Sequence, residues 1–342
     1  MSRVRNDQSL SIEMGKSRVE KMNVYLDTNV YSYLLEAREV RQARDYFRKI
    51  AATILVSDTV ILETARVPKR NERQRRLKAV RTVSNVRIDP PTPYREAIEI
   101  LNEIRRCRPT WLESKPDESM VKKCLRLNRR NWNDFKYNSL PDPAVGLPEY
   151  LRDAEPATNT FLAGQRQIRQ ALLQDEALEV RAGSSELQQY LESAGQTARY
   201  RRLQSAAVWA RALNGHAAMR DYKDFLGPYL AGPIGREEWD LFWVRDVNDN
   251  AMPVGRLRST IEFHQFTAKV SHGNPMDTDH GVHLADCDLL LTCDKEFSKV
   301  LNLVTQEGVP GARLGRPVLV SRRSGYSALE AIIGALEESA NV

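Results

Sequence analysis

Carboxylates are concentrated in one stretch of the sequence, GNPMDTDHGVHLADCDLLLTCDKEF at 273–297. Like charges at this spacing repel one another, and an unpaired carboxylate is costly to bury. A salt bridge, a row of helix caps or a bound cation could hold such acids together. The acids surround an apolar core, LLLTC, and only Lys295 offsets them: Asp277, Asp279, Asp286, Asp288, Asp294 and Glu296.

Strands that lead to acidic residues occur elsewhere in the chain as well. NVYLD predicts a buried strand ending at Asp27, and TILVS predicts a strand whose following helix carries Glu63. Asp277 lies in the first turn of the helix before LLLTC, and Asp294 follows that strand. Ligands of open parallel sheets gather at the carboxyl ends of the strands, so acids from these remote segments are expected to converge. Such hard oxygen ligands suit Mg²⁺ or Mn²⁺.

Strand and helix patterns alternate in two separate parts of the chain, with a helical region between them. The first part has predicted strands at 23–27, 53–57 and 86–91, and the second has LLLTC and RPVLV. Ser327 and Glu330 form a capping box for the last helix. The pattern predicts an α/β fold in which a parallel-sheet, three-layer (Rossmannoid) domain is interrupted by a mainly α-helical insertion.

This interpretation divides the chain into four segments. A polar N-terminal stretch is expected to be a flexible tail, and proline and glycine mark the joints within the helical region. The expected segments are the tail at 1–21, the first part of the α/β domain at 22–107, the helical insertion at 108–254 and the second part of the α/β domain at 255–342.

Composition narrows the class of protein. The chain has 342 residues, 42% of them hydrophobic and 28% charged, which is typical of a globular protein. No apolar run approaches the ~20 residues of a membrane helix, and the N-terminal stretch lacks the apolar segment of a signal peptide. We therefore expect a cytoplasmic protein without membrane association. The four cysteines match no zinc motif and are expected to be reduced thiols.

The order of the motifs resembles that of the PIN-domain nucleases: YLDTN, then SDTVILE, then D-x-x-H upstream of a T-x-D strand end. In that family four acids bind one or two Mg²⁺ or Mn²⁺ ions. The ions activate water for phosphodiester cleavage, usually of single-stranded or structured RNA. The resemblance implies Asp27, Glu63, Asp277 and Asp294 as the catalytic, metal-binding acids, with Thr28, Asn29 and Thr292 as polar residues that position them.

Two choices stay open around this quartet. Asp279 lies two residues from Asp277 on the same predicted helix, so it is the other candidate for the third acid. His280 and His283 are three residues apart, with His272 nearby, which raises the alternative of a zinc site. No third ligand has a clear spacing for zinc. His280 is therefore expected to support the site by hydrogen bonding to a ligating carboxylate.

Each acid also has a simpler interpretation. Asp27 could cap a helix, Glu63 could form an ion pair one turn along its helix, and Asp294 could be a turn residue. Asp277 and Asp279 could interact with the positive end of their helix. The occurrence of all four positions in order, at the strand ends of one α/β pattern, favours a metal site over four separate structural roles.

Basic residues gather in segments that could contact phosphates. The net charge is +6, and segment 66–87 has nine Lys or Arg residues and one acid, Glu72. A solvated helix face is the simpler explanation of such a run. In the insertion, RLNRRNW and RYRRLQSAAVWAR place Trp or Tyr near arginines, where the rings could stack on bases. The candidate nucleic-acid-binding residues are Arg73, Arg75, Arg76, Arg129, Arg130, Arg201 and Arg202.

Taken together, the sequence predicts a divalent-metal-dependent phosphodiesterase, an endoribonuclease in the first place, with DNA as the alternative substrate. One rival is a non-catalytic binding module for nucleic acid or protein on a PIN scaffold. Another is a toxin-type nuclease controlled by a cognate protein inhibitor, with the insertion as the docking surface. A homo-oligomer is compatible with the sequence too.

Overall fold

A five-stranded parallel sheet forms the centre of the computed structural model, which describes residues 22–137, 196–215, 220–268, 274–322 and 327–340. The strand order is β3-β2-β1-β4-β5, so strands from the two ends of the chain meet in the middle of the sheet. The bounds are β1 Asn23–Leu26, β2 Thr53–Val56, β3 Val86–Arg87, β4 Leu289–Thr292 and β5 Arg316–Leu319.

The two central strands, β1 and β4, are buried on both faces. Val24, Tyr25 and Leu26 are fully buried, and all four residues of β4 are buried. Successive side chains of a strand point to opposite faces, so burial of consecutive residues means that other elements cover both sides of the sheet. Tyr25 pairs with Leu290 in register, which aligns the carboxyl ends of the two strands. The predicted α/β class is confirmed.

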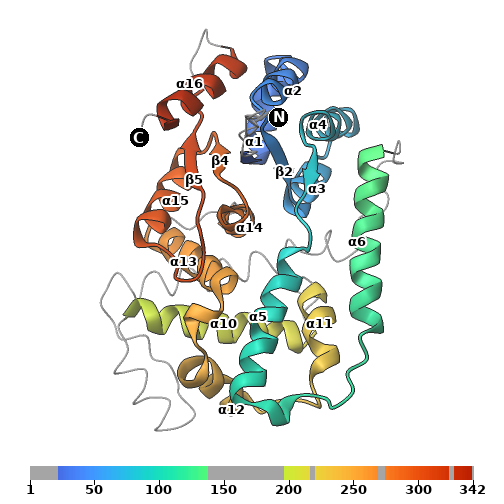
Figure 1. The fold of residues 1–342 in the computed structure, drawn as a ribbon, viewed down its shortest axis with the longest axis vertical. Coiled ribbons are helices and arrows are strands. Elements are labelled where there is room, and N and C mark those ends of the chain that lie inside the picture. The colour runs from blue at the N-terminus through green and yellow to red at the C-terminus, as the bar shows by residue number, and fades with distance from the viewer. Residues whose placement is uncertain (1–21, 138–195, 216–219, 269–273, 323–326, 341–342) are drawn as a thin grey trace, which may run out of the picture.

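Helices from both parts of the chain pack around this sheet in the upper half of Figure 1. The helices are α1 Thr28–Glu36, α2 Val40–Lys49, α3 Asp58–Ala65, α4 Arg70–Val83, α13 Pro253–Ala268, α14 Asn274–Gly281, α15 Lys295–Glu307 and α16 Ala328–Ala340. The apolar faces of all of these helices except α14 share one hydrophobic cluster with the strands.

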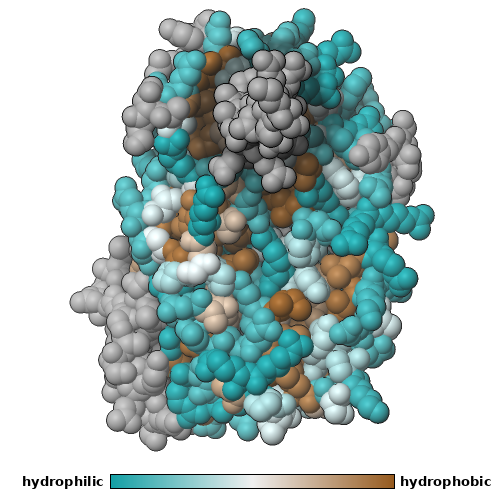
Figure 2. Space-filling model, in the orientation of Figure 1, coloured by the Kyte–Doolittle hydropathy of each residue, from teal (hydrophilic) through white to brown (hydrophobic). Residues whose placement is uncertain are grey.

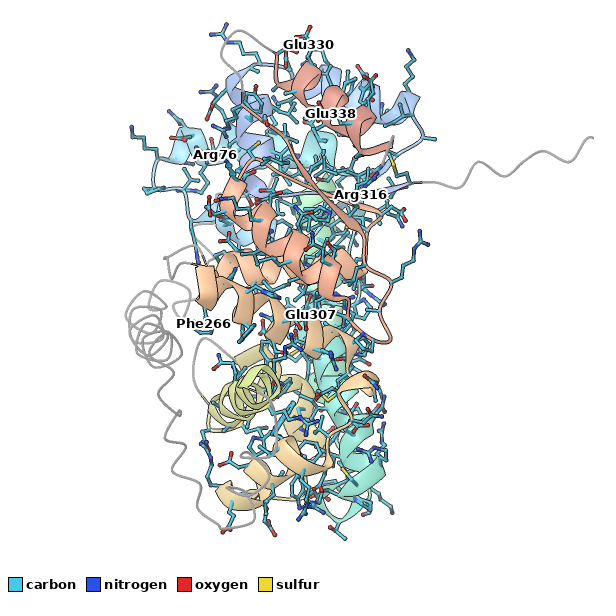
Figure 3. All side chains as sticks on the ribbon, turned by 90° about the vertical axis from the view of Figure 1, so that its left-hand side faces the viewer. Arg76, Phe266, Glu307, Arg316, Glu330 and Glu338 are labelled. Atoms are coloured by element: carbon cyan, nitrogen blue, oxygen red, sulfur yellow. The ribbon has the colours of Figure 1, made fainter. Side chains whose placement is uncertain are left out.

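A second, mainly helical region forms the lower half of the molecule in Figures 1 and 3, and one of its helices, α6 (Ser119–Tyr137), extends upward beside the α/β domain. It has its own hydrophobic cluster, in which Trp209, Trp239 and Trp243 are buried. Trp209 is therefore a core residue, and the suggestion that this ring stacks on bases is wrong. The helices are α5 Thr92–Cys107, α6 Ser119–Tyr137, α10 Gln196–Leu213, α11 Arg220–Leu226 and α12 Arg236–Leu241, which continues into a π-helical turn at Phe242–Asp246.

The described residues show how the two regions meet. The apolar side chains of α5 belong to the helical cluster, although this helix directly follows β3. Glu307, labelled in Figure 3, lies at the junction, where it pairs with Arg201 of α10 and His264 of α13. The segment boundaries given above remain a prediction. The tail at 1–21 and residues 138–195 of the expected insertion lie outside the described residues.

Two predicted helix starts have different outcomes. Ser327 and Glu330 exchange side chain–backbone hydrogen bonds of 2.9 and 3.2 Å, so the predicted capping box is confirmed. Asp27 occupies the N-cap position of α1, but its side chain makes no capping hydrogen bond. Its carboxylate points to other partners, described below.

None of the described helices combines the length and the apolar character needed to cross a membrane. All four cysteines are free thiols.

Helix α13 begins on a carboxylate from the helical region. Both oxygens of Glu99, on α5, accept backbone N–H groups at the start of α13, from Val254 at 2.9 Å and Gly255 at 3.0 Å. These two donors have no partner within their own helix, so the glutamate satisfies them. Burial raises the pKa of Glu99 to about 7, although the two backbone hydrogen bonds oppose the shift.

We expect the stability that Glu99 contributes to fall with rising pH. The pKa of Glu99 is about 7 in the folded protein, whereas the ordinary value for a glutamate is 4.5. The contribution is therefore fully present below about pH 4.5 and is lost as the pH rises through about 7. Glu99→Gln resembles the protonated form and does not titrate. The melting temperature of the variant minus that of the wild type should increase as the pH rises from about 5.5 to 8. A difference that does not change with pH would contradict the expectation.

Candidate metal centre

The carboxyl ends of β1, β2 and β4 form one edge of the sheet, and polar residues follow each of them. Asp27 comes directly after β1, Ser57 directly after β2, and Thr292 is the last residue of β4. Since β1 lies between β2 and β4, these three residues are brought together by the strand order alone. Ligand sites of open parallel sheets form at this edge.

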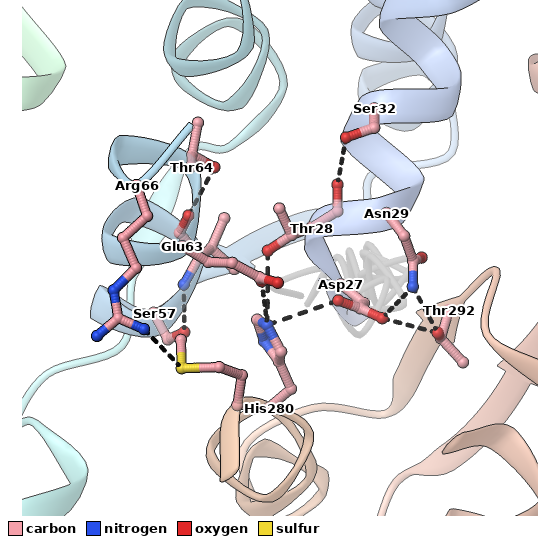
Figure 4. Close-up of polar contacts among 12 residues, drawn as sticks. Asp27, Thr28, Asn29, Ser32, Ser57, Glu63, Thr64, Arg66, His280 and Thr292 are labelled. Atoms are coloured by element: carbon pink, nitrogen blue, oxygen red, sulfur yellow. Dashed lines mark hydrogen bonds and ion pairs between the residues drawn. The ribbon is translucent and has the colours of Figure 1, made fainter. Parts of the chain in front are cut away.

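Asp27 is at the centre of this edge and is 4% exposed. Its Oδ2 accepts hydrogen bonds from Asn29 Nδ2 at 2.6 Å and Thr292 Oγ1 at 2.7 Å (Figure 4). Asn29 in turn accepts the backbone N–H of Cys293 at 2.7 Å, which connects α1 to the end of β4. One carboxylate oxygen is thus fixed by two donors, and the other faces His280.

His280, on α14, lies between the carboxylates of Asp27 and Glu63. Its Nε2 is 2.9 Å from Glu63 Oε2 and 3.5 Å from Asp27 Oδ1, and Thr28 Oγ1 is 3.5 Å away (Figure 4). Glu63 comes from α3, so the three side chains belong to three segments far apart in the sequence. Each offers a ligand atom within 4.8 Å of the others, and among the described residues this is the group that could hold a metal ion.

The ring of His280 is held from its other side by residues that the sequence analysis did not single out. Tyr25 Oη is 2.7 Å from His280 Nδ1 and 2.8 Å from Ser57 Oγ, in the buried interior. Ser57 also caps α3, the helix of Glu63, by accepting the backbone N–H of Val60 at 3.4 Å. Tyr25 is on β1, two residues before Asp27, which directly follows the strand. The alternation of a strand was therefore the one signal that could have placed both on the same face.

The charges of His280, Asp27 and Glu63 shift one another's pKa values. Burial disfavours its charged form, but the carboxylates of Asp27 and Glu63 outweigh burial and raise the pKa of His280 to about 9. Burial raises the pKa of Asp27 despite the nearby imidazole. Burial also acts to raise the pKa of Glu63. The hydrogen bond and the charge of His280 outweigh burial there, so the pKa of Glu63 is lowered. The charge of His280 acts to lower the pKa of both acids.

Asp277 lies one turn before His280 on α14 and is the acid most affected by the others. Burial raises its pKa to about 7, and the charges of Asp27, Asp294 and Glu63 act in the same direction, whereas His280 opposes them. Asp294 is exposed, and its Oδ1 accepts the backbone N–H groups of Glu296 and Phe297 at the start of α15. One of its carboxylate oxygens is therefore used as a helix cap.

Asp279 has a different environment from Asp277. Its Oδ1 accepts a hydrogen bond from the guanidinium of Arg258 at 2.8 Å, and the same guanidinium binds Glu96 Oε1 at 2.7 Å. Arg258 is on α13 and Glu96 on α5, so Asp279 takes part in the contact between α14 and the helical region. The acids two residues apart on α14 thus have different partners.

The other histidine of this stretch has a structural partner. His283 Nδ1 is 2.8 Å from Asp286 Oδ2, and Arg95 binds both oxygens of Asp286. Burial lowers the pKa of His283, which favours the neutral ring. Its ring stacks at a tilt on Tyr25, with centroids 4.9 Å apart. The zinc alternative also involved His272, which lies outside the described residues.

The predicted nucleic-acid-binding arginines occupy three kinds of environment. Arg73 is buried and donates to the carbonyls of Val67 and Pro68. Arg201 contacts Glu307 at the junction of the two regions, and Arg202 contacts the carbonyl of Val244 within the helical region. Arg75, Arg76, Arg129 and Arg130 are at or near the surface. Arg129 pairs with Asp89 at 3.0 Å, and Arg76 pairs with Glu72.

The donor set fits a hard divalent cation. Carboxylate oxygens from Asp27 and Glu63 converge with an imidazole, and the raised pKa of Asp277 reflects the crowding of negative charge beside them. Mg²⁺ and Mn²⁺ prefer oxygen ligands of this kind, and a cation relieves repulsion between carboxylates. His280 Nε2 points at the same place, so it could either bind an ion or hydrogen-bond a ligating carboxylate.

We expect Asp277→Asn and Asp279→Asn to change the melting temperature in opposite directions when it is measured at about pH 8 in EDTA. Asp277→Asn removes one charge from a crowded group of carboxylates, so the melting temperature should rise. Asp279→Asn removes the carboxylate bound to Arg258 and should cost about 1 kcal/mol, so it should fall. Differential scanning fluorimetry is sufficient to measure both.

The same two variants should respond differently to Mn²⁺. A cation that binds the folded protein raises its melting temperature. The wild type and Asp279→Asn should both show this increase, whereas Asp277→Asn should show a much smaller one. If Mn²⁺ raised the melting temperature of Asp277→Asn as in the wild type but not that of Asp279→Asn, Asp279 would be the metal ligand and Asp277 would not.

Comparison with known proteins gives a family match in the first part of the chain. The PIN domain model matches residues 24–110, a range that contains β1 to β3 and both Asp27 and Glu63. No protein with curated annotation and no solved structure matches the chain. The segment that carries His280, β4 and β5 lies beyond the matched range, and the parallel sheet joins it to the matched segment. Residues 24–110 are therefore similar to the PIN domain family, and the chain has a PIN-like α/β fold.

Proposed function

We propose that this protein is a divalent-metal-dependent phosphodiesterase that hydrolyses RNA as an endonuclease. The supporting observation is the convergence of Asp27, Glu63 and His280 within 4.8 Å at the carboxyl edge of the sheet. The PIN-like fold is a nuclease-type fold, and this edge is where it would present its acids. Four acids from four segments, in the order typical of PIN nucleases, are hard to explain by separate structural roles.

In this proposal Asp27, Glu63, Asp277 and Asp294 hold Mg²⁺ or Mn²⁺, with Asp279 as the alternative to Asp277. When bound, such an ion lowers the pKa of a water molecule and stabilises negative charge on phosphate oxygens. Thr292 and Asn29 fix the carboxylate of Asp27 through its Oδ2 and leave Oδ1 directed into the site. No side-chain nucleophile is required.

His280 is a positioning residue in this proposal. Its Nε2 hydrogen-bonds Glu63, and Tyr25 holds the opposite nitrogen of the ring, so the Glu63 carboxylate has one preferred orientation. Partners of this kind raise the precision of a metal site, and their loss typically reduces metal affinity or activity by about 10–100-fold. The hydroxyl of Thr28 lies 3.5 Å from Nε2 of His280, the nitrogen that contacts Glu63.

RNA is the proposed substrate because the PIN-domain nucleases usually cut single-stranded or structured RNA. The net charge of +6 suits a polyanionic partner. Arg75, Arg76, Arg129 and Arg130 are the surface arginines proposed to contact it. DNA is the second substrate class to be tested. The cytoplasmic location expected from the sequence is part of the same proposal.

The decisive experiment incubates purified protein with end-labelled single-stranded RNA and DNA in Mg²⁺, Mn²⁺ or EDTA. Cleavage of RNA should require the divalent ion. Asp27→Asn and Glu63→Gln keep the side-chain shape but remove a charged ligand. Each should lower the single-turnover rate by more than about 100-fold, because even supporting residues of metal sites cost up to that much.

Glu296→Gln is the matched control for these variants. It removes one negative charge two residues from Asp294, but the side chain of Glu296 is 69% exposed and pairs with Lys299. Its rate should equal that of the wild type. Wild-type turnover by Asp27→Asn at saturating Mn²⁺ would show that the site is misassigned. Binding of RNA without cleavage in either ion would favour the non-catalytic module.

A further inference from the structure

A surface groove separates helices α1 and α4 on the α/β domain. It has a volume of about 530 Å³, and one wall comes from α1 and the other from the first half of α4 and the residue before it. We call it the α1–α4 groove. Its lining residues are Ser32, Leu35, Glu36, Lys69, Arg70, Asn71, Glu72, Arg75 and Arg76.

The groove is positively charged. Four of its lining residues are basic and two are acidic, and each acid is already paired with an arginine. Glu72 binds Arg76 at 2.5 Å, and Glu36 lies 3.6 Å from Arg322. Lys69 and Arg75 are exposed, and their side chains have no hydrogen bond or ion pair in the part of the chain that the structure describes. Two cations are thus presented to solvent beside neutralised acids.

The basic wall is held in place by other arginines of the same run. The buried guanidinium of Arg73 donates to the carbonyls of Val67 and Pro68, which anchors the turn that carries Lys69. Arg76 donates to Ser32 Oγ at 3.1 Å across the groove and so connects α4 to α1. Part of the basic run therefore builds the groove, and Lys69 and Arg75 are left to interact with a ligand.

Helix α1 connects the groove to the candidate metal centre. Ser32 Oγ donates to the carbonyl of Thr28 at 3.2 Å, and Thr28 Oγ1 is 3.5 Å from His280 Nε2 (Figure 4). Four residues of helix correspond to a rise of about 6 Å. The groove thus begins one helical turn from the centre, on the same side of α1.

Figures 2 and 3 show the surroundings of the groove. Figure 2 shows a hydrophilic surface at the upper right, over α4. Figure 3 shows Arg76 on the α/β half of the molecule, away from the helical region. A polyanion that occupies the metal centre could continue along α1 into the groove.

We propose that the α1–α4 groove binds backbone phosphates of the RNA strand whose scissile phosphate lies at the metal centre. Lys69 and Arg75 make the phosphate contacts, and Asn71 offers hydrogen bonds without a charge. An acidic protein would also suit the charge, but alignment of the groove with the metal centre along α1 favours the substrate. This inference rests on the proposed function.

The test uses the full chain and the double variant Lys69→Ala/Arg75→Ala. Binding of a fluorescein-labelled single-stranded RNA is followed by anisotropy in EDTA, over a series of salt concentrations. Loss of two phosphate contacts should reduce the log–log salt slope by about 1.4 and the affinity by roughly tenfold at about 150 mM salt. In cleavage assays with Mn²⁺ the KM should rise.

Arg41→Ala/Lys49→Ala is the matched control. It also removes one Arg and one Lys, both exposed residues on α2 outside the groove, so the net charge changes equally. Its affinity, salt slope and KM should be those of the wild type. The melting-temperature increase caused by Mn²⁺ should be the same in both double variants and the wild type, because the metal centre is unchanged.

The outcomes separate the groove from the proposed function. If Lys69→Ala/Arg75→Ala matches the control in affinity and slope while the wild type cleaves RNA, the groove proposal is wrong and the nuclease stands. An acidic protein as the natural occupant would give this result. If the wild type binds but does not cleave RNA and only the groove variant loses affinity, the groove is supported and the nuclease fails.

Discussion

Repulsion between carboxylates at one edge of the sheet is the constraint on which the rest of this structure depends. Asp27 is buried at the end of a central strand, and Glu63 and Asp277 are brought close to it by neighbouring segments. Such a cluster is stable only if donors and positive charge surround it. Thr292 and Asn29 supply donors, and the imidazole of His280 supplies charge. A divalent cation would meet the same requirement more fully.

The need to hold His280 explains several features around it. Tyr25 and Ser57 come from adjacent strands and form a buried chain of hydroxyl groups that ends on its Nδ1. The next residue on α14 is Gly281, where an added Cβ would lie 2.7 Å from Ile261 Cδ1. The glycine therefore lets α14 approach α13 closely, directly beside His280. Backbone packing and side-chain hydrogen bonding thus act on the same residue.

Strand and helix positions were largely accessible from the sequence, because consecutive apolar residues such as LLLT mark buried parallel strands. The family resemblance followed from acids placed at the strand ends. The hydrogen bond between His280 and a ligating carboxylate was expected, and Glu63 is its partner. Other side-chain partners could not be predicted. Tyr25 was treated only as part of a strand, yet it binds His280. Arg73 was read with its neighbours as a substrate contact, yet its side chain is buried. One-dimensional spacing places a side chain on a helix face and does not show what packs against it.

Contacts between the two regions indicate that the helical region affects the geometry of the metal centre. Glu99 of α5 satisfies the first N–H groups of α13, and Arg258 of α13 joins Glu96 of α5 to Asp279 of α14. Helix α14 is the one that positions His280, and it has only eight residues, too short to be stable by itself. Its orientation must come from its neighbours, and α5 is connected to it through Arg258, whose side chain is 14% exposed. The helical region therefore acts as a support for α14, and part of what orients His280 toward Asp27 and Glu63 lies outside the sheet that carries the acids.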